Sequence, residues 1–450
     1  MTSTSTRHRA SWALAAGAAA LMLASAGSAD AQARIDGISG PTSFNFTAKA
    51  GEVSTPDGGA IHFWGYQDDA GTEGLPGGIL PQYPGPTLIL DQGDSVTINL
   101  TSELPFGRCS SMVFPGHVVA ASGGSAGLLT RESCGALDPV TYTFTASEPG
   151  TYMYHSGTEP GLQIEMGLVG AIIVRPSMGG AYAYNHADTA FDHEVLFLLT
   201  SMDPVVHALA EQNRFAEIDL TARKAVYWFI NGRAAPDDLA DAYVGWLPHQ
   251  PYNCTPRITP GQNILVRIIG ADQDQHPLHL HGNHYWEIAR YGRLLSSDGS
   301  TPDLQRGKFT TLTVPGQTVD ALFDWTGEKL GWDIYGGTDV WPAMAHLCNG
   351  LSTPSAGYDP VTHEYCPDHG KPFPVTLPEN QNLAFGGWWS GSPYMGAGEP
   401  LPPGEGGLNP NSGFFFMWHS HTEKELTNFD IFPGGMLSMM VVEPPGTPIP

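Results

Sequence analysis

The chain has 450 residues, of which 41% are hydrophobic and 14% are charged, a composition that fits a folded protein of about two or three domains. Its formal net charge of −25 argues against a nucleic-acid partner, because phosphates would repel it. The same charge argues against a basic patch for a membrane surface. The 55 glycines and 38 prolines indicate many turns and few long helices.

The first 33 residues have the pattern of an export signal. Arg7 and Arg9 lie in a short basic region, an apolar, Ala-rich run follows, and small residues near Ala31 and Ala33 suit cleavage. We therefore expect a periplasmic or secreted protein. No later apolar run approaches the ~18 residues of a spanning helix, so we predict no membrane span.

Export permits disulfides, and the sequence contains five cysteines. We favour two local pairs, Cys109 with Cys134 and Cys348 with Cys366, although spacing alone does not fix the connectivity. None of the five lies in a C-x-x-C motif or beside a histidine. We therefore expect no metal site built on cysteine.

Strands are marked by alternation of polar and apolar residues, which recurs in two similar halves. In the first half, residues 87–100 read as one half-buried strand, and residues 140–157 form a second run that is broken at Pro149-Gly150. The same pattern returns in three segments of the second half: 258–270, 309–325 and 434–445. Many short strands with Gly and Pro turns predict an all-β chain of two β-sandwiches.

We predict a signal peptide over 1–33, a first domain over 34–178 and a second over 190–446. From about 335 to 412 the periodicity fails, which indicates a long insertion within the second domain. This insertion would be either a surface excursion or a functional loop. Its aromatic stretch "GGWWSG", residues 386–391, either packs onto the core or lines the mouth of a site.

Histidines give the strongest functional signal. His279 and His281 are two residues apart on an expected strand, so both side chains point to one face. His419 and His421 repeat that spacing. If the two strands are neighbours, four imidazoles converge, and neutral imidazoles suit copper, zinc, iron and nickel.

These motifs carry a family resemblance. "HPLHLHG" resembles the HPxHxHG copper motif of multicopper oxidases, and "HSHTEKELTNFDIFPGGM" resembles their last copper motif. "PQYPGPTLILDQGDSVTINL" and "GTYMYHSGTEPGLQIEMGLVGAIIV" resemble the beginning and end of their first domain. The resemblance implies two cupredoxin-like Greek-key domains and copper as cofactor. In the family, electrons enter at a type 1 copper and pass to a trinuclear cluster that reduces dioxygen to water. The resemblance implies a copper centre either between the domains or between the subunits of a homotrimer, since two-domain relatives build their clusters at trimer contacts.

Carried over residue by residue, the resemblance assigns candidate metal ligands. His276 matches a type 1 ligand, while the four paired histidines match cluster ligands: His279, His281, His419 and His421. His155 matches the first histidine of a further pair, whose second position is Gly157 here. The first-domain H-x-H-G motif is absent, and His117 is the nearest candidate. His117 could equally be an ordinary strand-end residue.

The type 1 site departs from the family pattern. Ser420 stands in place of the thiolate ligand, and Glu425 in place of the next histidine. A blue copper site needs two histidines and a cysteine, so we predict that none forms. Met436 would be either a residual axial ligand or a core residue, and we expect Glu425 and Glu423 to lie on a solvated strand end. Ser156 repeats the serine substitution in the first half.

The sequence therefore predicts an exported copper-dependent oxidoreductase that uses dioxygen without a type 1 relay. Its substrate would be a small molecule or a metal ion. A non-enzymatic copper-binding or copper-sequestering protein is the alternative, and a scaffold that binds partners but no metal is a third. Oxygen uptake on turnover separates the first two, and metal analysis separates both from the third.

Overall fold

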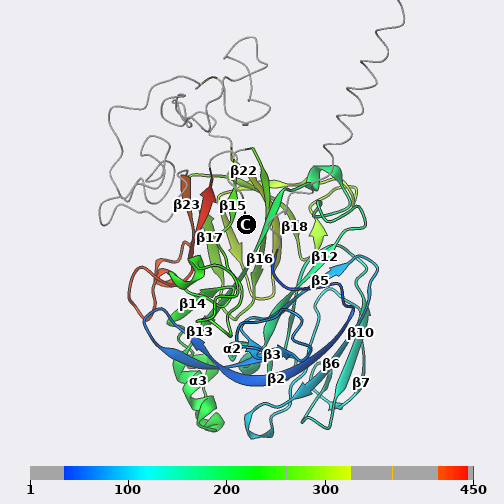
Figure 1. Cartoon of the computed structure of the whole chain (residues 1–450), viewed down its shortest axis with the longest axis vertical. Helices are drawn as coiled ribbons and strands as arrows, with labels where there is room; N and C mark the ends of the chain where they lie inside the picture. Colours follow the sequence, from blue (N-terminus) through cyan, green and yellow to red (C-terminus); the bar gives the residue numbers. More distant parts are fainter. Residues whose placement is uncertain (1–34, 260, 326–366, 368–413, 444–448, 450) are drawn as a thin grey trace, which may run out of the picture.

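The computed structural model describes residues 35–259, 261–325, 367, 414–443 and 449. The predicted export signal, almost all of the predicted insertion and the predicted Cys348–Cys366 pair lie outside these residues. The described chain forms two β-sandwiches packed against each other. In Figure 1 the blue strands of the first sandwich lie in the lower part of the view, and the red strand of the second sandwich lies in the upper part.

The first sandwich pairs a four-stranded sheet with a six-stranded sheet. The four-stranded sheet consists, in spatial order, of β1 (Ile38–Ser39), β5 (Gly85–Asp91), β12 (Val169–Arg175) and β11 (Gly150–His155). The six-stranded sheet consists of β4 (Pro81–Gln82), β3 (Ala60–Asp68), β2 (Ser43–Ser54), β6 (Ser95–Ser102), β10 (Val140–Thr145) and β7 (Ala120–Gly123). A separate two-stranded ribbon is formed by β8 (Ser125–Ala126) and β9 (Arg131–Glu132).

The prediction of one strand over residues 87–100 was wrong. This segment supplies two strands, β5 and β6, which belong to opposite sheets of the first sandwich. Gly93 turns the chain between them with φ +99°, a conformation that favours glycine. The alternation continues across the turn because each strand points its apolar residues into the same core, with Leu88 and Leu90 on one side and Ile98 on the other.

The second sandwich pairs a seven-stranded sheet with a five-stranded sheet. The larger sheet consists of β14 (Tyr227–Ile230), β13 (His193–Met202), β16 (Asn263–Gly270), β22 (Thr318–Asp324), β18 (Tyr285–Arg290) and β19 (Arg293–Leu294), with β20 (Arg306–Lys308) also paired to β18. The smaller sheet, called here the histidine sheet, consists of β15 (Arg257–Ile258), β24 (Leu437–Val442), β23 (Phe414–Ser420), β17 (His276–Leu280) and β21 (Thr310–Thr313).

Helices are short in the described part of the chain, as the glycine and proline content predicts. The α-helices are α2 (Pro160–Glu165) and α3 (Pro204–Glu211). Asp203 caps α3 by accepting a hydrogen bond from the Val205 amide at 2.9 Å. The 3₁₀ turns are η1 (Pro105–Gly107), η2 (Ala187–Thr189), η3 (Phe215–Glu217), η4 (Leu220–Ala222), η5 (Asp237–Leu239) and η8 (Glu423–Leu426). Among the described residues, no helix combines the length and apolarity needed to cross a membrane.

The two sandwiches join through an apolar layer and a buried ionic network. The apolar layer includes Met153 and Ile173 from the first sandwich and Leu198 from the second. In the ionic network, Glu194 accepts hydrogen bonds from both Arg175 and Arg267. Arg267 also contacts Asp320 at 3.4 Å. Buried ion pairs contribute little net stability but cost several kcal/mol when one partner is removed, so this network favours one relative placement of the two sandwiches.

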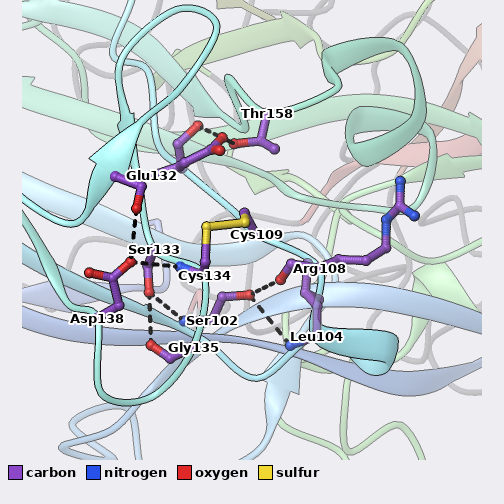
Figure 2. The surroundings of a disulfide bond; sticks show 12 residues. Ser102, Leu104, Arg108, Cys109, Glu132, Ser133, Cys134, Gly135, Asp138 and Thr158 are labelled. Carbon is purple, nitrogen blue, oxygen red and sulfur yellow. Dashed lines mark hydrogen bonds between the residues drawn. A yellow bond between two sulfur atoms is a disulfide. The ribbon is translucent and has the colours of Figure 1, made fainter.

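The predicted Cys109–Cys134 disulfide is confirmed, with a sequence separation of 25 residues. Figure 2 shows the hydrogen bonds around it. The Ser133 hydroxyl accepts from the Ser102 amide at 3.0 Å and donates to the Gly135 carbonyl at 3.1 Å. The disulfide therefore ties the segment before β10 to the segment that follows β6.

Candidate metal centre

Two antiparallel strands in the middle of the histidine sheet position the paired histidines. The register of β17 and β23 places His279 directly opposite His419. β17 ends at Leu280 and β23 ends at Ser420. The next residues, His281 and His421, are held by backbone hydrogen bonds. The His281 amide donates to the Met417 carbonyl at 3.0 Å, and the His421 amide donates to the Pro277 carbonyl at 2.7 Å. Alternation along each strand turns all four side chains to the same face.

The four imidazoles converge as the spacing predicts. The ring centre of His279 lies 4.9 Å from that of His281, 5.4 Å from that of His419 and 5.1 Å from that of His421. The His281 and His419 Nε2 atoms are 2.7 Å apart. Two imidazole nitrogens this close share either a proton or a metal ion, since two lone pairs would repel. The ligand atoms of His279, His281 and His419 all lie within 4.8 Å of one another.

Hydrogen bonds to the second ring nitrogen orient two of these imidazoles. His419 Nδ1 donates to the Ser420 carbonyl at 2.6 Å, which leaves its Nε2 as the free electron-pair donor. His279 Nδ1 lies 2.8 Å from the Thr310 hydroxyl. Such bonds fix the tautomer and the ring plane of metal-binding histidines in known sites.

Burial favours the neutral form of two of these imidazoles, His279 and His419. Burial lowers the pKa of His419 to about 4, against the opposing effect of the Ser420 carbonyl and with help from the neighbouring histidines. The pKa of His279 is also lowered, first by burial and then by the charge of His421. A neutral imidazole is the form that binds a metal, so the group is prepared to bind one at neutral pH.

The first sandwich contributes a similar histidine, but not to this group. His155 ends β11, and its Nδ1 donates to the Ser156 carbonyl at 2.9 Å, as His419 does to Ser420. Burial lowers the pKa of His155. Among the described residues, the set of ligand atoms within 4.8 Å of one another includes His279 and two of its neighbours but not His155.

His117 is placed among aromatic side chains. Its ring centre lies 4.8 Å from that of Phe144 and 4.6 Å from that of Tyr152. Burial lowers the pKa of His117 to about 4, and within the described chain its Nε2 is buried without a hydrogen-bond partner. His117 is likewise absent from the close group in the second sandwich, and its role as a ligand stays a prediction.

His276 is fully buried and bonds to two carboxylates instead of facing the four imidazoles. Its Nδ1 lies 2.9 Å from Glu425 Oε2, and its Nε2 lies 3.0 and 3.2 Å from the two oxygens of Asp272. Burial alone would lower the pKa of His276, but Asp272 and Glu425 outweigh it and raise the pKa to about 10. Both ring nitrogens therefore carry protons, and neither can donate to a metal.

The expectation of a solvated Glu425 was wrong: this side chain is buried, although Glu423 is exposed. Asp272, the other partner, was not identified from the sequence. It lies four residues before His276 in "ADQDQHPLHLHG", and an acid at that spacing was the available signal. Nothing in the sequence spacing distinguished a carboxylate facing the histidine from one facing water.

The other two residues that match type 1 ligand positions, Ser420 and Met436, are engaged in contacts within the protein. Ser420 is completely buried, and its hydroxyl accepts from the Thr422 amide at 3.2 Å. Met436 packs in the main apolar core of the second sandwich. The residues present therefore do not fit a type 1 copper ion, which needs two neutral imidazoles and a thiolate.

Comparisons with known proteins agree with the sheet architecture. Residues 76–179 match the family model described as multicopper oxidase. A 128-residue segment is 33% identical to an L-ascorbate oxidase of Cucurbita pepo var. melopepo, covering 27% of this chain and 21% of that protein. A 97-residue segment is 36% identical to multicopper oxidase MCE of Talaromyces pinophilus, covering 21% of this chain and 15% of that protein. Over these segments the chain is similar to multicopper oxidases. Its matches span about a fifth of the length of these relatives or less.

Solved structures show the fold. The chain superposes on multicopper oxidase mgLAC with a TM-score of 0.53 and 16% identity, covering 91% of this chain and 87% of the other. It superposes on the blue copper oxidase from Nitrosomonas europaea with a TM-score of 0.52 and 17% identity, covering 89% and 85%. The predicted all-β, cupredoxin-like fold is confirmed. The matched family model and the copper oxidase structures imply copper as cofactor, and the converging imidazoles suit it.

Proposed function

We propose that this protein, which resembles multicopper oxidases, is a copper-dependent oxidoreductase that works without a type 1 copper. Copper would be held by the four converging imidazoles, His279, His281, His419 and His421. The observation that carries this proposal is the convergence of the four rings, with Nε2 atoms of His281 and His419 only 2.7 Å apart. Bound copper supplies one-electron exchange between a reductant and dioxygen.

Because a type 1 copper would be absent, electrons would pass directly from the substrate to the copper held by the four histidines. Reduction of dioxygen to two water molecules takes four electrons and four protons, so four one-electron oxidations of a small molecule or metal ion would supply them. The face around the histidines is open to solvent, since His421 is exposed and Phe309, which lies edge-on to His279 at 6.0 Å, is 55% exposed. This opening supports contact between a small reductant and the site.

Copper stoichiometry tests the ligands. His279 and His281 changed together to alanine should remove most of the bound copper and the dioxygen uptake that depends on it, because two of four donors are lost. His186→Ala, a change of a half-buried histidine on the connection between the sandwiches, is the matched control and should keep both. Retention of copper by the double variant would show that the metal is bound elsewhere.

A non-enzymatic copper-binding protein is the second candidate, favoured by the filled type 1 position at His276. The two functions are separated by dioxygen consumption with a reductant present. Copper binding without any turnover by the fully loaded protein would favour the binding function.

We also propose that the protein is exported, to the periplasm or beyond the cell, and that it is a homotrimer. The Cys109–Cys134 disulfide supports export, because such bonds persist in oxidising compartments. His155 supports assembly, because it repeats the His419 arrangement outside the close group, where a second copy could use it. Light scattering of the purified, copper-loaded protein measures the assembly, and a monomer would contradict it. We propose that the first domain spans residues 34–178 and the second spans residues 190–446.

A further inference from the structure

A cavity of about 770 Å³ lies where the N-terminal segment meets the second sandwich. Its walls include Ile35, Asp36 and Ile89 from the first half and Val195 and Tyr243 from the second. None of the predicted metal ligands lines it. The volume falls in the range of small-molecule sites, and such sites often form where two domains meet.

The cations on the cavity wall are already paired. Arg175 directs two guanidinium nitrogens to the two oxygens of Glu194, and Arg257 contacts Glu443 at 3.1 Å. Arginines engaged in this way have little capacity left for an anionic ligand. The cavity therefore offers no free positive charge from these two residues.

Asp36 and Asp241 are the carboxylates of the wall that are not bonded to its arginines, and of the two Asp36 is the more buried, since Asp241 is exposed. Within the described part of the chain, its carboxylate has neither a hydrogen bond nor an ion pair, and it is only partly exposed. Arg233 is the positive charge that acts on the Asp36 carboxyl, but its guanidinium donates to the carbonyls of Gln250, Pro251, Ala240 and Asp241. Burial raises the pKa of Asp36 to about 6, with Arg233 opposing the change. A partly buried carboxylate without a bonded partner is stabilised by a cation that binds to it.

Tyr243 supplies an aromatic side chain to the cavity wall, and Glu73 lies close enough to Asp36 for their charges to interact. Tyr243 lines the same cavity and has a left-handed backbone, with φ +57°, which is unusual for a bulky residue and often marks a functional position. Burial, opposed by bonds from Tyr252 and Gln82, raises the pKa of Glu73 to about 7, and the charge of Asp36 contributes to that rise. An aromatic face beside a carboxylate suits an ammonium group, because the ring attracts cations.

We propose that this cavity binds an organic primary amine. The ammonium group would pair with the Asp36 carboxylate beside the Tyr243 ring, and the hydrocarbon body would lie along Ile35, Ile89 and Val195. A hydrated divalent metal ion fits less well, because Glu194 is already paired with two arginines and Asp241 is exposed, which leaves Asp36 as the one partly buried carboxylate ligand. The inference does not depend on the proposed oxidoreductase function.

Calorimetric titration with n-hexylamine and with 1-hexanol, which have the same length but differ in charge, tests the proposal. At pH 7.5 the wild-type protein should bind hexylamine roughly tenfold more tightly than hexanol or better, the ratio expected for a hydrogen bond to a charged group. Asp36→Asn should bring the two affinities together, because the neutral amide keeps the shape of the side chain. The matched control Asp430→Asn, in an exposed loop, should keep the preference.

Copper can bind amines, so all three proteins are compared at the same copper content. Lowering the pH to 5 should reduce the preference of the wild type, since Asp36 then becomes protonated while hexylamine stays charged. Equal affinity of the wild type for the two probes, persistence of the preference in Asp36→Asn, or no binding of either probe would each overturn the proposal.

Discussion

Replacing His276 with alanine separates a structural role from a metal-binding role. In the folded protein this fully buried imidazole bonds to Glu425 at 2.9 Å and to Asp272 at 3.0 and 3.2 Å. Its removal leaves two buried carboxylates facing each other with no cation between them. Loss of one member of a buried ion pair costs about 3–5 kcal/mol. For a domain of this size, that corresponds to a fall in Tm of roughly 6–20 °C.

Differential scanning calorimetry and copper analysis of the same sample measure the two effects. We expect His276→Ala to lose stability but to keep its copper, because His276 does not face the other imidazoles. A triple variant with His276→Leu, Asp272→Asn and Glu425→Gln should recover most of the Tm, since the unpaired charges are removed with the cation. Loss of copper from His276→Ala with little change in Tm would refute this reasoning and restore His276 as a ligand.

Three further predictions concern other parts of the molecule. Ser420→Cys alone should show no intense absorption band near 600 nm after copper loading, because Glu425 leaves no second imidazole; a blue product would contradict the assignment of Glu425. Removing the Cys109–Cys134 disulfide by paired serine substitutions should lower the free energy of unfolding by about 3.5 kcal/mol, read from denaturant titration, because the loop spans 25 residues. Asp36→Asn should stabilise the protein by up to ~3 kcal/mol above pH 7 and by nothing near pH 4, because folding raises the pKa of this acid and only its ionised form is penalised. Thermal melts at the two pH values check the last prediction, and an equal gain at both would contradict it.

The fold was predictable because each strand carries its own apolar alternation. The broken run over residues 140–157 became β10 and β11, and the run ending at residue 445 became β24. The error over residues 87–100 has a simple cause: Gly93 reverses the chain without interrupting the alternation. Sequence periodicity reports which face of a strand is buried, but it does not report which sheet the strand joins.

The convergence of four histidines was predictable from two H-x-H pairs on neighbouring strands, because strand geometry alone turns both members to one face. The partners of His276 were not. Asp272 lies in the loop before β17, and Glu425 lies in η8 after β23, so only the folded chain shows that they meet at one imidazole. Long-range pairing of buried charges leaves no local pattern in a sequence.

The serine at position 420 and the glutamate at position 425 can be explained together if His276 is a cation. In a copper site the metal carries the positive charge, and its ligands are electron-pair donors. Here Glu425 supplies a buried negative charge instead of an imidazole, and Asp272 supplies another. Protonated His276 lies between them and provides the positive charge that the metal would have provided, with its two N–H groups as the donors. Serine at position 420 then needs to fill space and accept one amide hydrogen bond, which it does from Thr422. Ser420→Cys alone would leave no second imidazole, and Glu425→His alone would leave no thiolate, so restoring a blue copper site requires that Ser420 and Glu425 change together.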